Sequence, residues 1–310
     1  MPDQDLVVHD DGRALTIATD RTELAHYVYR PDAPAAEAPK PYFHPLRTTS
    51  GAPVTNYRPW DHRWHKGVQM TLSHVTDVGS GQGQNFWGGP TFEADAPGNG
   101  YVWRENLGRQ EHVEFDKVTA GDAVEVAERL DWITSHGDRW FFEQRTFRVA
   151  QVDPDRGVWV LDFSTDLTSV HTAPLRIGSP TTHGRPLAGY TGFFWRGPRA
   201  WTDAPLLAAD GTDGEEIMGR PADWVAMAGL HDGLDGGATV LMYAGTTSAA
   251  VPLTWFARNS MFAALAPSPA FSEEFEVARG ATLSLRHRLV VIDEALDRAA
   301  LLPLAAEFTP

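Results

Sequence analysis

The chain has 310 residues, no cysteine and a formal net charge of −15. The charge disfavours nucleic acid and anionic membranes as partners, and the lack of cysteine excludes thiol catalysis, disulfides and thiolate-bound metals. Hydrophobic residues make up 42% of the sequence, which is enough for a folded core. The first five residues lack an apolar signal core, and no apolar run approaches the ~20 residues that cross a bilayer, so we expect a cytoplasmic protein.

Alternation of polar and apolar residues recurs along the chain, with Gly, Pro, Asp and Asn between the alternating segments. In the last segment, Leu283, Leu285 and Leu289 share one face, while Arg286 and Arg288 share the other. This pattern is typical of strands with one buried face. We expect strands at 13–19, 24–30, 68–76, 111–118, 123–132, 140–150, 157–166, 224–230, 238–244 and 281–292, with one helix at 293–301. Without helix–strand alternation, the sequence predicts an all-β fold, a large antiparallel β-sandwich forming a single domain over 1–310.

Two loops interrupt this pattern. Residues 31–41 are rich in Pro, Ala and Glu and are expected to be a surface excursion. Residues 79–99 are rich in glycine and surround Asn85 and Trp87. A loop of this length in a compact domain is usually a binding loop or mobile.

The segment 60–67 combines two histidines, a carboxylate, two cations and two tryptophans. Residues three apart in a strand face opposite ways, so His62 and His65 converge only on a loop or helical turn. Such a pair can act as general acid and base or bind a divalent metal, although one histidine could simply orient its neighbours. Trp64 beside them offers an apolar face to a sugar ring.

Further candidates for ligand binding lie in three segments. His44 and Arg47 could hold an anionic or hydroxyl-rich ligand, with a structural turn as the alternative. Asn85 and Trp87 lie in the glycine-rich loop. The segment 183–196 is polar, aromatic and interrupted by glycines that let backbone approach a ligand closely. Its candidates are His183, Arg185, Tyr190, Trp195 and Arg196.

Two pairs of charged residues have different predicted roles. Glu143 and Arg145 share one face of a strand, where we expect them to pair on the surface. Glu273 and Glu274 are adjacent, so only one of them can point inward from an extended chain. An inward carboxylate beside the flanking phenylalanines would have a raised pKa and suit proton transfer. An arginine partner would instead lower its pKa and leave it as an anchor.

Several of these segments together resemble a bacterial family of unknown function, DUF6807, which also carries the label "methane oxygenase PmoA-like". The resemblance spans about residues 40–292, with Arg63 where proline is usual and Lys66 where histidine is common. The motifs are Lys-Pro-Tyr-Phe-His-Pro-Leu-Arg (40–47), Asp-His-x-Trp-His-x-Gly (61–67), Asn-Phe-Trp-Gly (85–88), Gly-Arg (184–185), Gly-Tyr-x-Gly-Phe-Phe-Trp-Arg (189–196), Ala-Asp-Trp-Val (222–225) and Phe-Ser-Glu-Glu (271–274).

The order of the reactive residues also resembles that of galactose-mutarotase-type supersandwich proteins. Those enzymes place an early histidine, a middle histidine and a late glutamate over a sugar ring. The resemblance implies His62 or His65, then His136 or His183, then Glu273 or Glu274.

We therefore expect a carbohydrate-active enzyme that performs acid–base chemistry on a saccharide, by epimerisation, β-elimination or glycoside cleavage. The segments 40–47, 60–67, 85–88, 183–196 and 271–274 should then converge on one concave face. The alternatives are a non-catalytic carbohydrate-binding or sensing protein and a histidine-ligated metal enzyme. We predict no other cofactor and a small saccharide as the partner.

Overall fold

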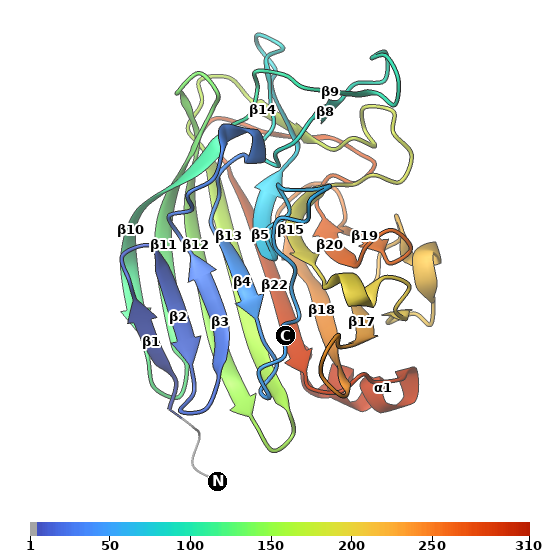
Figure 1. Ribbon diagram of the computed structural model, residues 1–310. Coiled ribbons are helices and arrows are strands. Elements are labelled where there is room, and N and C mark those ends of the chain that lie inside the picture. Colours follow the sequence, from blue (N-terminus) through green and yellow to red (C-terminus); the bar gives the residue numbers. More distant parts are fainter. Residues whose placement is uncertain (1–4) are drawn as a thin grey trace.

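The structure is a computed structural model that describes residues 5–310. The prediction that the N-terminal segment 1–5 lacks an apolar signal core therefore falls mostly on residues outside the described range. Two eight-stranded antiparallel sheets dominate the fold (Figure 1). The first sheet has the order β1 (Val7–Asp10), β2 (Ala14–Ala18), β3 (Glu23–Val28), β4 (Tyr42–Leu46), β5 (Val68–Leu72), β15 (Thr191–Arg196), β20 (Ala264–Ser268) and β19 (Thr254–Arg258).

The second sheet contains the longest strands of the fold. Its order is β10 (Arg109–Thr119), β11 (Val124–Ile133), β12 (Arg139–Asp153), β13 (Val158–Ser169), β22 (Thr282–Ile292), β18 (Gly237–Thr247), β17 (Trp224–Leu230) and β16 (Leu206–Ala208). The main hydrophobic core contains inward-facing residues of both sheets. This arrangement confirms the predicted all-β fold and the large antiparallel sandwich.

Two small sheets lie at one end of the sandwich. Their orders are β21 (Phe275–Val277), β14 (Leu175–Gly178), β6 (His74–Asp77) and β7 (Gly83–Gln84), and β8 (Thr91–Phe92) with β9 (Tyr101–Val102). Figure 1 shows β8, β9 and β14 above the ends of the large sheets. Because β7 and β8 fall inside 79–99, the predicted binding loop contains short paired strands.

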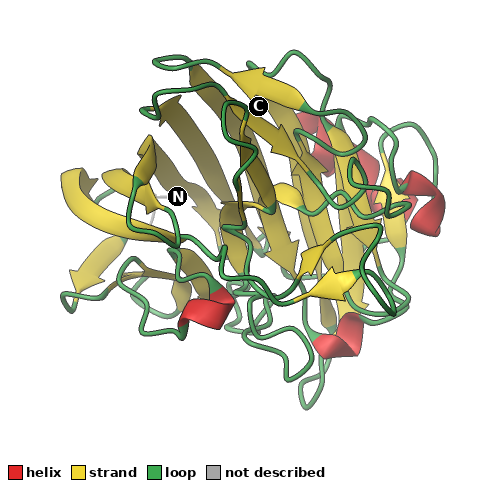
Figure 2. Cartoon of the chain, turned by 90° about the horizontal axis from the view of Figure 1, so that it is seen from above, coloured by secondary structure: helices red, strands yellow, loops and turns green. Residues whose placement is uncertain are grey.

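Helix is confined to short peripheral pieces (Figure 2). They are the 3-10 turns η1 (Ala35–Glu37), η2 (Arg199–Trp201) and η3 (Gly214–Ile217) and the helix α1 (Arg298–Glu307). The helix begins five residues later than the predicted 293, because Asp297 caps it by accepting a hydrogen bond from the Ala300 N–H at 2.9 Å. No helix in residues 5–310 is long and apolar enough to cross a bilayer.

Strand β22 confirms the predicted buried face, but its opposite face is polar only in part. Leu283, Leu285 and Leu289 are buried in the main core as predicted. Val290 and Ile292 on the other face are also buried, because α1 packs over this end of the second sheet. The polar face predicted for the strand therefore covers only its first half.

The expected strand 68–76 is two strands in different sheets. Strand β5 pairs with β4 and β15 in the first sheet, whereas β6 pairs with β7 and β14 in a small sheet. The chain changes sheet at Ser73. This change brings Ser73 and His74 to the cavity described below.

The prediction that Glu143 and Arg145 form a pair is confirmed, but the predicted surface location is wrong. They do pair, with Arg145 Nε 2.8 Å from Glu143 Oε1, but their exposed fractions are 0% and 1%. Arg145 also donates to the Tyr27 hydroxyl at 3.1 Å, and Trp132 donates to Glu143 at 2.7 Å. The pair survives burial between the sheets because these partners satisfy it.

The expected surface loop 31–41 is anchored at its end. Glu37 is buried and accepts hydrogen bonds from Arg58 and Lys66, the latter also buried. The loop therefore braces the segment that follows β4 rather than standing free in solvent.

Candidate functional site

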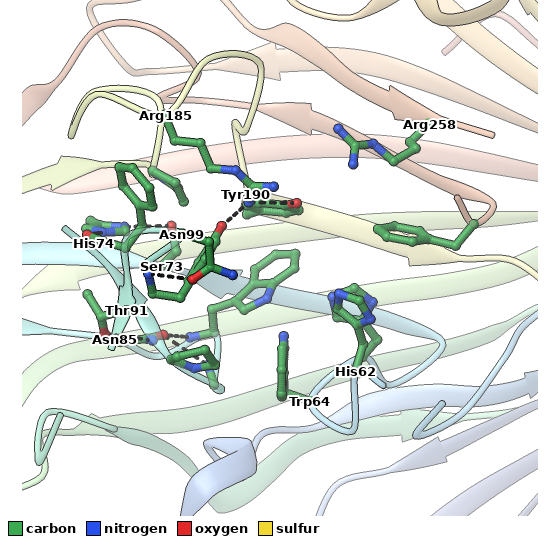
Figure 3. A pocket seen from close by; sticks show the side chains of 18 of the residues that line it. His62, Trp64, Ser73, His74, Asn85, Thr91, Asn99, Arg185, Tyr190 and Arg258 are labelled. Atoms are coloured by element: carbon green, nitrogen blue, oxygen red, sulfur yellow. Dashed lines mark hydrogen bonds between the residues drawn. The ribbon is translucent and has the colours of Figure 1, made fainter. Parts of the chain in front are cut away.

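A cavity of about 280 Å³ lies over the outer face of the first sheet, where β15, β19 and β20 meet (Figure 3). Successive residues of a strand face opposite ways. Phe193 and Trp195 therefore point into the main core, while Phe194 points to the outer face and packs with Phe256 and Phe262. This second apolar cluster forms the base on which the polar loops of the cavity rest.

A tight turn brings the two histidines of segment 60–67 together. The His62 N–H donates to Pro59 O at 2.9 Å, and the His65 N–H donates to His62 O at 3.0 Å. The two imidazole centroids are 4.8 Å apart, and both rings line the cavity. The predicted convergence of His62 and His65 on a turn therefore holds.

Ion pairs with Glu37 hold both ends of this turn. Arg58 donates to both Glu37 oxygens, at 2.6 Å and 2.9 Å for its shortest contacts, and Lys66 donates to the same carboxylate. Although burial raises the pKa of Glu37, these donors outweigh burial and the pKa lies below its usual range. The ionised carboxylate thus ties both ends of the histidine turn to one point.

Glycine lets Trp64 pack closely against the loop that carries Asn85. Gly88 and Gly89 have φ of 99° and 69°, and a Cβ on Gly89 would lie 2.6 Å from the Trp64 indole. The Asn85 amide oxygen accepts from the Trp87 and Gly88 N–H groups at 2.8 Å and 2.9 Å. Asn85 lines the cavity, but these bonds make it chiefly the residue that shapes the turn.

Asp61 lies at ion-pair distance from His62, although the Nδ1 of His62 makes no hydrogen bond within residues 5–310. This Nδ1 lies 3.3 Å from Asp61 Oδ2, and Arg199 donates to Asp61 Oδ1 at 2.6 Å. Burial lowers the pKa of His62 below its usual 6.5, against the opposing pull of Asp61. Burial, aided by Arg196, lowers the pKa of His65 much further. Both rings are therefore neutral at neutral pH and can accept a proton.

Two arginines face the cavity from other elements. Arg185 Nη1 donates to the Tyr101 hydroxyl and lies 3.3 Å from the Tyr190 hydroxyl, with its guanidinium over both rings. Arg258, at the end of β19, lies 5.8 Å from the Phe262 ring centroid. Figure 3 shows both arginines on the side of the cavity away from Trp64.

Seven of the predicted site residues line this cavity. From segment 60–67 they are His62, Trp64 and His65, and from the remaining segments they are Asn85, Trp87, Arg185 and Tyr190. The predicted convergence therefore holds for segments 60–67, 85–88 and the first part of 183–196. The face involved is the outer face of the first sheet.

Four predicted ligand contacts lie elsewhere. His44 Nδ1 lies 2.9 Å from Thr55 Oγ1, and burial lowers its pKa to about 4. Arg47 donates to Gly51 O within a turn. Trp195 is core, and its indole N–H donates to Val54 O at 2.9 Å. Arg196 is buried beneath the cavity, 4.1 Å from the Phe262 ring centroid, without lining the cavity.

The predicted pair of His183 and Glu274 sits beside a neighbouring cavity. His183 Nε2 lies 3.3 Å from Glu274 Oε1, and His183 lines a cavity of about 490 Å³ together with His136 and His74. Glu274 is exposed and 3.8 Å from Arg176, so the expected burial beside the phenylalanines does not occur. Glu273 is also exposed. His74 lines both cavities, and its ring centroid is 4.4 Å from that of His183.

Other lining residues were not found from the sequence. They are chiefly Ser73, His74, Tyr101, Arg258, Met261 and Phe262. Ser73 and His74 lie within 68–76, where the alternation predicted a single continuous strand. Arg258 and Phe262 flank the turn between β19 and β20, where only the Asn-Ser turn signal marked the position.

A metal site needs several ligand side chains that converge on one point. Residues 5–310 contain no group of three or more His, Asp or Glu residues placed to hold a metal ion. His62 and His65 form a pair without a third ligand, whereas protein sites for zinc usually supply at least three.

The fold is a large antiparallel β-sandwich with a cavity lined by polar and aromatic residues on the outer face of its first sheet. The sequence matches the family of unknown function DUF6807 over residues 14–306, and the chain belongs to this family. No curated protein matches the sequence.

Solved structures with a similar arrangement include α-galactosidases. The alpha-galactosidase from Lactobacillus brevis is 10% identical, with a TM-score of 0.40 over 94% of this chain and 39% of that enzyme. The GH36 alpha-galactosidase AgaB from Geobacillus stearothermophilus is 8% identical, with a TM-score of 0.44 over 94% and 41%. The galactosidase domain of the alpha-galactosidase–sucrose kinase AgaSK is 10% identical, with a TM-score of 0.48 over 94% and 42%. The chain thus spans about two-fifths of the length of these proteins.

Proposed function

We propose that the chain is a carbohydrate-active enzyme in which His62 is the general base for a saccharide bound in the 280 Å³ cavity. The observation that carries this proposal is a neutral imidazole, backed by Asp61, on the wall of an aromatic cavity. With the Asp61 carboxylate beside Nδ1, we take Nε2 as the nitrogen that accepts the proton. Trp64 and Trp87 would stack on the apolar face of a sugar ring.

The residues that line the cavity favour epimerisation and β-elimination over glycoside cleavage. Within residues 5–310, the lining contains no Asp or Glu. Glycoside cleavage commonly uses two carboxyl groups that flank the bond, so the lining does not favour it. β-Elimination, and epimerisation at a carbon next to a carbonyl or carboxylate, begin with removal of a proton from carbon, which a neutral imidazole can perform. Tyr190 is our candidate for the group that returns a proton to the substrate.

His183 and Glu274 are assigned a supporting role in this proposal. The cavity that His183 lines shares Ser73, His74, Thr91 and Phe92 with the first one. A saccharide of more than one ring could extend from Trp64 into the second cavity and meet His183 there.

Proton abstraction can be tested without knowing the product. The protein would be incubated in D2O with a panel of neutral sugars, sugar acids and short oligosaccharides, and proton NMR would follow exchange of carbon-bound hydrogen. We expect exchange on one substrate class, reduced roughly 10²–10⁴-fold in His62→Gln. His9→Gln, at an exposed strand position, is the matched control and should be unchanged.

The aromatic lining alone also suits a carbohydrate-binding or sensing protein, the second candidate. That function would show as saccharide binding by the wild-type protein with no exchange and no conversion. In that case His62→Gln would change affinity only.

A further inference from the structure

The charge around the cavity differs from that of the whole chain. The sequence has 41 acidic and 26 basic residues, yet the lining carries Arg185, Arg258 and histidines but no acid. Arg196 adds a third guanidinium directly beneath Phe262. In residues 5–310, none of these three arginines forms an ion pair with a carboxylate.

Arginines close by behave differently. Arg58 pairs with Glu37, Arg104 with Glu93, and Arg199 with Asp61. Other arginines in residues 5–310 also form no ion pair, but Arg63, Arg220 and Arg279 are exposed to solvent, whereas Arg185 and Arg258 are partly buried. Within residues 5–310, Arg185 and Arg258 at the cavity and Arg196 beneath it have no carboxylate as ion-pair partner.

Aromatic and sulfur contacts hold these guanidiniums without neutralising them. Arg185 lies over Tyr101 and Tyr190, at 4.9 Å and 5.6 Å from the ring centroids. Arg258 lies over Phe256 at 5.5 Å, and its Nη1 is 3.3 Å from Met261 Sδ. The Nε of Arg258 is buried and has no hydrogen-bond partner. Cation–π contacts position a guanidinium but leave its donors free for a ligand.

Resting on the proposed function, we propose that the saccharide is anionic and that its carboxylate or phosphate binds at Arg185 and Arg258. Planar guanidiniums bind these groups with charge-assisted hydrogen bonds, which are stronger inside a partly desolvated cavity. A neutral ligand would leave both arginines desolvated without a counter-charge. A carboxylate neutralised in this way also makes the adjacent C–H bond easier for His62 to deprotonate.

Isothermal titration calorimetry tests the inference on the whole chain. The probes are D-glucuronate, D-galacturonate, D-glucose 6-phosphate, D-glucose and D-galactose, with acetate and inorganic phosphate as anions that lack a sugar. We expect one class of anionic sugar to bind at least about tenfold more tightly than its neutral counterpart. The uronate and phosphate arms distinguish the two sources of charge.

Variants connect the preference to these arginines. Arg258→Gln should weaken the anionic sugar roughly tenfold or more and leave a neutral sugar nearly unchanged, while Arg258→Lys should recover part of the loss. Arg185→Gln should act in the same direction. Arg279→Gln, at an exposed arginine outside the cavity, is the matched control.

Each outcome decides between the two proposals. Equal affinity for neutral and anionic sugars, insensitive to Arg258→Gln, overturns the anionic inference and leaves the proposed function standing. Acetate or inorganic phosphate binding as tightly as any sugar keeps an anion site but overturns the saccharide function. Absence of binding by every probe overturns both.

Discussion

Replacement of Arg196 by Met is expected to stabilise the protein. The guanidinium is 0% exposed, and all three of its nitrogens lack a hydrogen-bond partner among residues 5–310. Burial lowers the pKa of Arg196 from 12.5 to about 9. A shift of this size means that the charged form destabilises the folded state by about 5 kcal/mol.

The net gain is smaller because one favourable contact disappears. Arg196 lies 4.1 Å from the Phe262 ring centroid, and a buried cation–π contact contributes roughly 2 kcal/mol. We therefore expect Arg196→Met to raise the free energy of unfolding by about 3 kcal/mol, within the range found when buried charges are replaced by apolar residues. Urea denaturation followed by tryptophan fluorescence would measure it.

The pH dependence supplies an independent check. Below pH 9 both folded and unfolded states hold the Arg196 proton, so the destabilisation is complete. Above pH 9 the folded state releases the proton while the unfolded state retains it, so wild-type stability rises relative to the variant. The advantage of Arg196→Met should therefore be full at pH 7 and smaller at pH 10.

Arg145→Met is the matched control, since Arg145 is equally buried but fully paired. Its loss leaves Glu143 uncompensated and should cost roughly 3–5 kcal/mol. If Arg196→Met destabilises the protein to a similar degree, Arg196 has partners in solution, and the argument from an unpaired guanidinium is refuted. The acid limb of any pH–rate profile should also move to higher pH in Arg196→Met, because Arg196 helps to lower the pKa values of His62 and His65.

Three further predictions concern the loops and a metal. Gly89→Ala should lower the free energy of unfolding by at least about 1–3 kcal/mol and weaken ligand binding, because its Cβ would lie 2.6 Å from Trp64. Gly280→Ala is the control, since Gly280 has a similar φ of 76° and open space around it. It should lower the free energy of unfolding less and leave ligand binding, measured by calorimetry, unchanged. Glu37→Gln should destabilise by roughly 3–5 kcal/mol in urea. Because the folded pKa of Glu37 is lowered, its contribution is present above 4.5 and lost as pH falls through the lowered value, so variant and wild type should converge in acid. Elemental analysis of untreated protein should find no stoichiometric metal, and chelator treatment should leave ligand binding unchanged; a bound metal that binding requires would favour the metal-enzyme alternative.

The local sequence carried enough information for the strands and for part of the site. Alternation in β22 identified the buried face that holds Leu285 and Leu289, because a strand has a period of two wherever it lies. The density of unlike groups in 60–67 identified His62 and His65, since such a mixture fits neither core nor plain surface. The glycines around Asn85 and Trp87 marked a loop, because glycine punctuates regular structure.

Tertiary structure alone decided which face of each strand met which neighbour. Phe194 forms the base of the cavity while Trp195 is core, and only the pairing of β15 with β5 and β20 distinguishes them. Alternation likewise could not tell that the face bearing Glu143 and Arg145 would be covered by the first sheet. The β19–β20 hairpin brings Arg258 to the cavity because β20 pairs with β15, and β6 brings His74 there because it pairs with β14. Each of these pairings, of β20 with β15 and of β6 with β14, joins strands distant in sequence. Such pairings depend on the whole chain closing into two sheets, so no local pattern contains them.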